Sequence, residues 1–185
     1  QKSANIATQQ PKPFGMASKV RGRHRTQVCG SRYNFCLNGI SGFRNMECKV
    51  SWMGQDGMAF VAQTGSGHIV AMDGAPEGGG HNQAPRPMEM LLVGTGGCTA
   101  YDVVLILKKS RAEVKDCSVT LKAERASEDP KVFTKIHFHF TVTGRNLNPA
   151  TVERAVTLSH DKYCSASIML AKTAELTHSV EIVEG

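Results

Sequence analysis

Residues 85–109 form a long and almost uncharged stretch, and this stretch constrains the fold more than any other. Pro87 suits the first turn of a helix, where a missing N–H costs nothing, and Glu89 then lies at the positive end of the helix dipole. Lys108 and Lys109 lie at the negative end. Because nearly every residue between them is apolar or small, the helix is apolar on all sides, which is typical of a core helix. The stretch therefore predicts one central, buried helix.

Three glycines and a cysteine lie in the middle of this predicted helix. Gly94, Gly96 and Gly97 each lower helix propensity by roughly 1 kcal/mol relative to alanine, so they favour a place where another backbone packs closely. Cys98 follows directly and is expected at that crowded junction. The helix alone leaves two interpretations open, because buried cysteines often serve as small core residues and the thiol can also be reactive.

Charge divides the chain near residue 46. The formal net charge is +6, but residues 1–45 contain eight basic and no acidic residues, whereas the rest contains 14 basic and 16 acidic residues. Segment 1–45 also lacks a hydrophobic period, so we expect a basic, disordered leader. Its composition fits a tag or mis-assigned start, an organelle transit peptide, or a basic arm that touches nucleic acid. Residues 46–185 are expected to form one domain without a basic face for nucleic acid.

The cysteine pattern indicates an intracellular protein with reduced thiols. Six cysteines occur without a C-x-x-C pair, so the sequence contains neither a zinc-ribbon nor a thioredoxin motif. We find no secretory h-region and no run of about 18 apolar residues, so no membrane association is predicted. We expect a cytoplasmic location, and the sequence predicts neither a metal nor a cofactor.

Strand patterns flank the central helix on both sides. The expected strands comprise three short ones and a long hairpin, at 48–53, 58–63, 68–72, 114–126 and 131–143. The glycine-rich segment 73–84 lacks the lysine and the glycine order of a phosphate-binding loop, so it is interpreted as a flexible surface loop. A helix that begins at Asn148-Pro149, a short helix at 165–174 and a closing strand at 176–183 complete the pattern.

The second arm of the hairpin separates apolar from polar side chains by strand alternation. Its apolar face contains Ile136, Phe138, Phe140 and Val142. His137 and His139 lie on the opposite face, and without a third ligand nearby they are interpreted as solvated residues and not as a metal site. Cys117, on the apolar side of the first arm, is assigned to packing.

Cys164 lies just before the short helix predicted at 165–174. A thiolate at a helix N-terminus is stabilised by the helix dipole, so its pKa is expected to fall below the free value of about 8.5.

The order of these elements resembles that of the OsmC/Ohr family, over residues 46–184, with its YhfA-like branch as the nearest match. The resemblance rests on three motifs, Ala84-Pro85-Arg86-Pro87-Met88-Glu89-Met90-Leu91-Leu92, Gly96-Gly97-Cys98 and Lys162-Tyr163-Cys164-Ser165. It implies an α+β fold in which antiparallel sheets wrap around a long central helix that carries a cysteine. It also implies an intertwined homodimer with active sites at the subunit interface.

The resemblance further implies a thiol peroxidase that reduces organic hydroperoxides in defence against oxidative stress. In that role Cys98 would be the peroxidatic cysteine and Cys164 the resolving one, with a dithiol such as dihydrolipoamide as the reductant. The alternative is an OsmC-like binding or redox-sensing protein that lacks peroxidase turnover.

The activating residues of the family are not reproduced position by position. The acid that usually follows the helix-starting proline is replaced by Met88, and Glu89 comes one residue later, about 100° further around the helix. Residues 46–72 contain no arginine that could activate the thiolate, which leaves Arg86 and His68 as the nearby candidates. In addition, serine and not proline follows the second cysteine. The candidate site therefore consists of Cys98 and Cys164, with Glu89 and Arg86 as further catalytic candidates.

Overall fold

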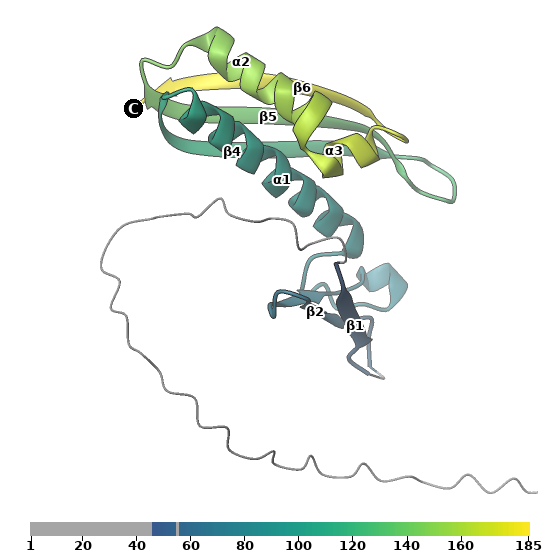
Figure 1. The fold of residues 1–185 in the computed structure, drawn as a ribbon. Coiled ribbons are helices and arrows are strands. Elements are labelled where there is room, and N and C mark those ends of the chain that lie inside the picture. The colour runs from purple at the N-terminus through teal and green to yellow at the C-terminus, as the bar shows by residue number, and fades with distance from the viewer. Residues whose placement is uncertain (1–45, 55) are drawn as a thin grey trace, which may run out of the picture. The chain divides into compact units, whose positions relative to one another are not determined.

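The computed structural model describes residues 46–54 and 56–185. The predicted leader, 1–45, lies outside the described residues. Within them the chain forms three short strands, a long helix, two long strands, two further helices joined by a π-helical turn, and a last strand (Figure 1). The α+β class and the order of elements predicted from the sequence are confirmed.

The first sheet is an antiparallel meander of short strands. It consists of β1 (Cys48–Trp52), β2 (Phe60–Thr64) and β3 (Ile69–Met72), in the order β1-β2-β3. All five residues of β1 are exposed, and Ala62 in β2 is the one buried residue of these three strands. The described residues therefore give this sheet almost no core of its own.

The glycine-rich loop after β3 is more ordered than the sequence suggests. The carboxylate of Asp73 is 1% exposed and accepts hydrogen bonds from the backbone N–H groups of Gly74, His81 and Gln83, at 2.7, 3.0 and 3.0 Å. The Gln83 N–H has the largest effect in lowering the pKa of this carboxyl. A Cβ at Gly80 would collide with the Gly74 backbone, so the loop closes tightly on itself. It also contains a short 3₁₀ turn, Pro76–Gly78.

Helix α1 (Pro87–Lys109) matches the predicted central helix, but one chain covers only one side of it. The buried side contains Thr95, Gly96, Thr99, Val103 and Leu107. The large apolar residues left exposed on the helix are Leu91, Val93, Tyr101 and Leu105. The prediction that α1 is buried on all sides therefore does not hold within a single chain. By length and composition α1 is long and apolar enough to cross a membrane, as the core helices of soluble proteins can also be.

The second sheet consists of β4 (Glu113–Arg125), β5 (Phe133–Arg145) and β6 (Glu175–Glu184), in that order. β4 and β5 form the predicted antiparallel hairpin, and a register shift between Val114 and Asp116 marks the irregularity expected at its start. The expectation of purely antiparallel sheets needs correction, because β6 pairs with β5 in parallel.

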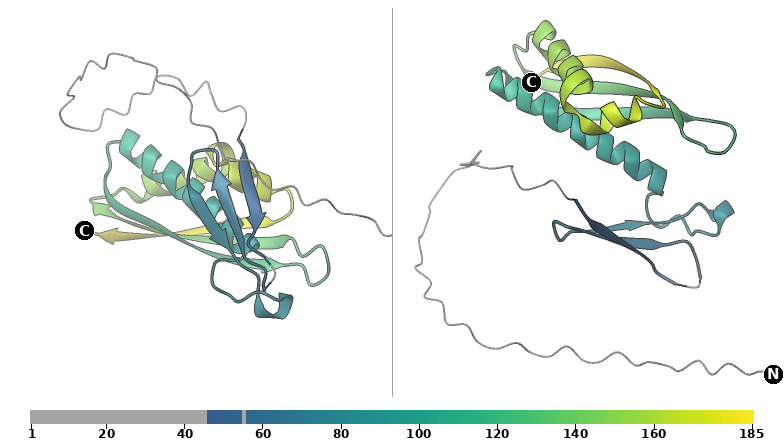
Figure 2. Two further views of the ribbon diagram at one scale, coloured as in Figure 1. Left: turned by 90° about the horizontal axis from the view of Figure 1, so that it is seen from below. Right: turned by 45° about the vertical axis from the view of Figure 1, so that its right-hand side comes forward.

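The parallel pairing of β6 follows from the connection between the last two strands. Parallel neighbours need a crossover, and here the crossover consists of α2 (Pro149–Leu158), the π-helical turn η2 (Ser159–Tyr163) and α3 (Ser165–Leu170). These elements and α1 cover the same face of the sheet (Figures 1 and 2). They bring the chain back to the start of β5 before β6 begins.

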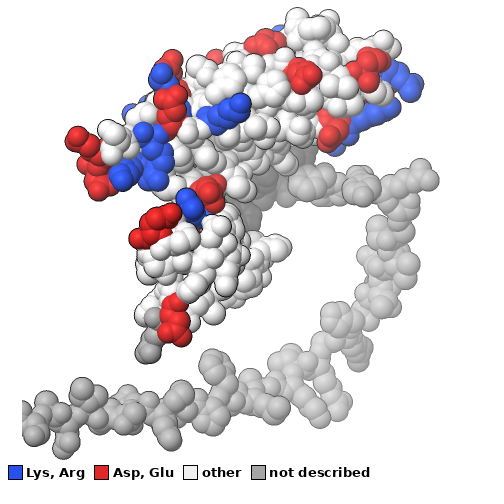
Figure 3. Space-filling model, turned by 180° about the vertical axis from the view of Figure 1, so that it is seen from behind, with Lys and Arg blue, Asp and Glu red and all other residues white. Residues whose placement is uncertain are grey.

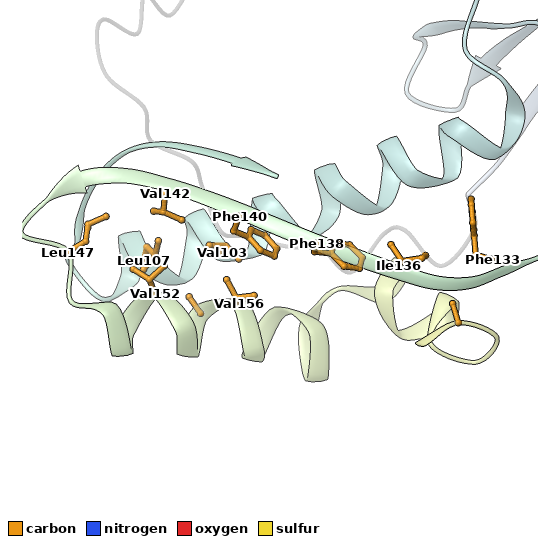
Figure 4. Packing of buried hydrophobic residues seen from close by; sticks show 12 residues of the cluster. Val103, Leu107, Phe133, Ile136, Phe138, Phe140, Val142, Leu147, Val152 and Val156 are labelled. Carbon is orange, nitrogen blue, oxygen red and sulfur yellow. The ribbon is translucent and has the colours of Figure 1, made fainter. Parts of the chain in front are cut away.

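The core lies between this sheet and the helices. Phe138, Phe140 and Val142 of β5 are fully buried, which confirms the predicted apolar face, and they pack toward Val103 of α1 and Val156 of α2 (Figure 4). Each such side chain contributes roughly 1.5–3 kcal/mol through burial. The alternate residues of β5 form hydrogen bonds on the other face, where the His137 ring lies 2.8 Å from the Thr177 hydroxyl.

Candidate functional site

Two free thiols that are distant in the sequence meet beside α1. Cys98 lies in the middle of this helix, and Cys164 lies between the η2 turn and α3. Their sulfur atoms and a carboxylate oxygen of Asp102 all lie within 4.8 Å of one another. Cys164 is completely buried, whereas Cys98 is partly exposed. The structure therefore brings together the two cysteines that the sequence analysis selected.

The η2 turn places Cys164 next to α1. The Cys164 N–H donates a 2.8 Å hydrogen bond to the Ser159 carbonyl, five residues earlier, as a π-helical turn requires. The Ser159 hydroxyl lies 2.9 Å from that of Thr99, and both residues are completely buried. Since Thr99 follows Cys98 in α1, this contact fixes the distance between the two thiols. Such turns are frequent at functional sites, but the sequence pattern gave no signal for one here.

Hydrogen-bond donors converge on the sulfur of Cys164. This residue is the N-cap of α3, as the sequence predicted, and its sulfur accepts hydrogen bonds from the Ser167 N–H at 3.4 Å and the Ser167 hydroxyl at 3.2 Å. Both contacts fix the direction in which this sulfur points.

Cys98 has a different electrostatic environment. Burial is the largest influence and raises the pKa of its thiol, and the neighbouring Cys164 and Asp102 raise this pKa further. A hydrogen bond from the Ala166 N–H acts in the opposite direction. Within the described part of the chain, none of the main influences on this pKa is a lysine or an arginine. Among the described residues, therefore, no lysine or arginine stabilises the Cys98 thiolate.

Asp102 is the member of this cluster that the sequence analysis missed. It lies four residues after Cys98 in α1, and the Ser159 hydroxyl donates a 3.3 Å hydrogen bond to its carboxylate. Burial raises the pKa of this carboxyl, and the hydrogen bond from Ser159 partly opposes the effect. The available signal was its position, because residues four apart lie on the same face of a helix.

Arg86 and Glu89 lie at the start of α1, away from the thiols of the same chain. The Glu89 carboxylate accepts a 2.9 Å hydrogen bond from the Arg86 backbone N–H, so it caps the helix. Nine residues of helix separate Glu89 from Cys98, which corresponds to about 13 Å along the axis. Arg86 and Glu89 line a cavity of about 450 Å³ that is also bordered by Asp73 and Phe133.

Cys117 lies outside the cluster, as predicted. It faces Val142 across the hairpin, packs against the core and lines an apolar groove of about 550 Å³ between α1 and β4. His68, the other candidate near the first sheet, lies 3.0 Å from the Ser66 hydroxyl within a turn.

The thiol cluster is also the one group of potential metal ligands found in the parts of the chain that the structure describes. Thiolates and carboxylates suit zinc, but a structural zinc site takes four protein ligands and this cluster supplies three. Two thiols at such a separation can also form a disulfide if they approach each other further.

Comparison with known proteins agrees with this fold. The family model described as "OsmC-like protein" matches residues 80–179, more than half of the chain. The chain is also 49% identical over 138 residues to Protein YhfA of Escherichia coli strain K12, a match that covers 75% of this chain and 98% of that protein. The protein therefore belongs to the OsmC family.

Solved structures show the same fold. A hypothetical protein from Aquifex aeolicus is 30% identical with a TM-score of 0.66, over 76% of this chain and 98% of that one. An organic hydroperoxide resistance protein OsmC from Legionella pneumophila is 20% identical with a TM-score of 0.58, over 75% and 98%. At 20% identity, the similarity to the Legionella protein concerns the fold alone.

Proposed function

We propose that this protein reduces organic hydroperoxides with Cys98 and Cys164 and thereby contributes to defence against oxidative stress. The observation that carries the proposal is the pair of free thiols whose sulfur atoms lie within 4.8 Å although they come from distant segments. A disulfide needs a sulfur–sulfur distance of about 2 Å, so the two sulfurs must approach each other before they can bond.

The reaction uses three chemical steps. The Cys98 thiolate attacks the O–O bond, which yields a sulfenic acid on Cys98 and an alcohol. The Cys164 thiol then condenses with the sulfenic acid to give a disulfide and water. A small dithiol, such as dihydrolipoamide, restores both thiols by exchange and leaves as its own disulfide. Burial supports this order, because Cys98 is partly exposed to the substrate and Cys164 is completely enclosed.

The named functions of structural relatives support the same chemistry. The relatives from Legionella pneumophila and Elizabethkingia anophelis are both called organic hydroperoxide resistance proteins, and the second is 16% identical with a TM-score of 0.58. At such identity their activity does not transfer with the fold. Peroxidase activity is therefore inferred from this chain's own pair of thiols.

The active form is a homodimer with its sites at the subunit interface. The exposed apolar side of α1 supports this assembly, because Val93 and Tyr101 are 61% and 63% exposed in one chain. A Cβ at Gly94 or Gly97 would meet no atom within 4 Å, so a second helix can approach closely there. A large exposed apolar surface of this kind is typical of an interaction site.

The partners we propose are small molecules in a reducing cytoplasm, without nucleic acid or membrane. On the face drawn in Figure 3, lysine and arginine side chains are interspersed with aspartate and glutamate, so this face offers no continuous basic surface to a phosphate backbone.

A second candidate function is that of a binding or redox-sensing protein without peroxidase turnover. The raised pKa of Cys98 favours this alternative, because a smaller thiolate fraction reacts more slowly with peroxide. Arg86 and Glu89 also lie at the start of α1, away from the thiol of the same chain.

A peroxide-consumption assay separates the two functions. With cumene hydroperoxide and dithiothreitol, the wild-type protein should consume peroxide catalytically, and Cys98→Ser should abolish the activity. Cys164→Ser should react once and leave a sulfenic acid on Cys98 that can be trapped. Cys117→Ser is the matched control and should retain turnover. A wild-type protein that consumes no hydroperoxide would support the binding or sensing function.

A further inference from the structure

Asp102 is a half-buried charge whose position packing does not explain. It is the one charged residue of α1 between Glu89 and Lys108, in a stretch that is otherwise apolar or small. Placing a carboxylate in such surroundings is costly unless it is paired. The salt bridges found among the described residues do not include Asp102. Its carboxylate accepts a hydrogen bond from the Ser159 hydroxyl, and the two sulfur atoms lie within 4.8 Å of it.

The proposed reaction requires a group that carries a proton, and the Asp102 carboxylate can do so. Cleavage of a hydroperoxide by a thiolate expels an alkoxide, which is a strong base and a poor leaving group unless it receives a proton. The thiol must also give up its proton before it attacks. No lysine or arginine of the described residues acts on Cys98 to favour the thiolate, so a neighbouring proton carrier has a clear role.

We infer that Asp102 is a catalytic residue that accepts the proton of the Cys98 thiol and delivers it to the departing oxygen of the hydroperoxide. This inference rests on the proposed peroxidase function. The Asp102 carboxylate first takes the thiol proton, which leaves a thiolate and a carboxylic acid. The thiolate then bonds to the terminal oxygen as the O–O bond breaks. The carboxylic acid finally protonates the alkoxide, so the products are Cys98 sulfenic acid, an alcohol and the original carboxylate.

The geometry permits this transfer. A separation of up to 4.8 Å between the carboxylate oxygen and the Cys98 sulfur is spanned by one water molecule or by a small side-chain rotation. The Ser159 hydroxyl orients the carboxylate at 3.3 Å, and Ser159 is itself held by Thr99 at 2.9 Å. Burial raises the pKa of Asp102, which makes its protonated form easier to reach during the reaction.

If Asp102 transfers the proton, its removal should affect two reactions of Cys98 differently, whereas structural damage to the site should slow both. The negative charge of Asp102 raises the pKa of Cys98, so its removal should increase the thiolate fraction. Removal of the carboxylate also removes the proton carrier, so the peroxide step should become slower. Cys98 should therefore become no less reactive toward an alkylating agent while it becomes much less reactive toward hydroperoxide. Besides Asp102, the titratable group that faces Cys98 is Cys164, which a serine can replace.

The experiment compares both reactions in the full chain carrying Cys164→Ser. Sulfenic acid formation with cumene hydroperoxide is followed by dimedone trapping and mass spectrometry, and Cys98 alkylation by iodoacetamide is measured at pH 7. We expect Asp102→Asn to slow sulfenic acid formation about 100-fold, in line with general acid–base catalysis. Alkylation should be unchanged or faster. Asp102→Glu should recover part of the peroxide rate, and Asp116→Asn, an exposed charge on β4, should change neither rate.

Three results would overturn the inference. If Asp102→Asn leaves the peroxide rate within about threefold of its parent, Asp102 carries no catalytic proton and the proposed peroxidase function still stands. If the two rates fall together, Asp102 has a structural role. If the Cys164→Ser parent itself forms no sulfenic acid, the proposed function fails, and the inference fails with it.

Discussion

The two sheets of this protein share a strand pattern but differ in what covers them. In β5, the apolar residues Phe138 and Phe140 are fully buried beneath the helices. In the first sheet, Val50, Trp52 and Ile69 are 52%, 53% and 64% exposed. Strand alternation alone does not decide burial, because it says only which residues share a face. The helices of the same chain cover the second sheet, whereas the described residues leave the first sheet uncovered.

The thiol pair belongs to the self-contained region. Cys98 is fixed by α1, and Cys164 is fixed by the η2 turn through the buried contact of Thr99 with Ser159. The pair therefore forms from contacts within one chain. A second subunit would enclose the site and cover the exposed side of α1, but it is not needed to bring the two sulfurs together.

The largest expected effect comes from the covered sheet. Phe140→Ala should lower the free energy of unfolding by about 3–5 kcal/mol, because it removes a buried ring and leaves a cavity. Denaturant titration measures this loss. Trp52→Ala is the comparison variant, and because this side chain is half exposed in one chain, its main effect should be weaker self-association. A loss below about 1 kcal/mol for Phe140→Ala would show that the core is assigned wrongly.

The next largest effect concerns the uncovered side of α1. Val93→Asp should raise the dissociation constant of the dimer by about 100-fold, because an unpaired charge would enter an apolar interface. Sedimentation over a range of concentrations measures this constant. Ser127→Asp adds the same charge at an exposed position in the β4–β5 connection and should leave the constant unchanged. A wild-type protein of monomer mass at every concentration contradicts the proposed shared site.

A smaller effect is expected from pH, through His160 in the η2 turn. Burial, with a contribution from the nearby His178, lowers the pKa of His160 to about 4 from 6.5. Both ring nitrogens lack a hydrogen-bond partner among the described residues, and the ring packs edge-on against Phe138 at 4.6 Å between ring centroids. The unfolded chain therefore binds a proton below pH 6.5 that the folded chain takes up only near pH 4.

The folded state should thus lose stability as the pH falls from 6.5 to 4. We expect about 1–2 kcal/mol from this histidine, because solvent screening reduces the full effect of the shift in pKa. Denaturant titrations at several pH values should show a weaker pH dependence in His160→Phe than in the wild type. Equal slopes for the two proteins would mean that His160 titrates normally in the folded state.

The smallest effect is expected from removal of residues 1–45. This segment has no acidic residue and no hydrophobic period, so the fold should not depend on it. Its deletion should leave the thermal midpoint within about 2 °C, since roughly 1 kcal/mol shifts a domain of this size by a few degrees. A larger drop in a calorimetric scan would show that residues 1–45 pack against the folded domain.

Much of the fold could be predicted from the spacing of apolar residues and from the residues that mark the starts of helices. Pro87 and Asn148-Pro149 mark the starts of α1 and α2, and the alternation around Phe138 gives the core face of β5. The parallel pairing of β6 could not be predicted this way, because strand alternation is the same in parallel and antiparallel pairs.

The candidate site was predictable only in part. Cys98 and Cys164 could be selected as rare residue types at informative positions. Asp102 could have been selected from its position four residues after Cys98, but its contact with Ser159 depends on the π-helical turn, which has no sequence signature. Local residue order also gives no indication of which side of α1 remains uncovered within one chain.

The central claim is that Cys98 and Cys164 of the same chain form one redox pair. Peptide mapping after one equivalent of cumene hydroperoxide tests it most directly, with isotope-labelled and unlabelled chains mixed so that disulfides within and between chains can be distinguished. We expect a Cys98–Cys164 disulfide within one chain. Free thiols at both positions while hydroperoxide is still consumed, or a disulfide that joins two chains, would contradict it.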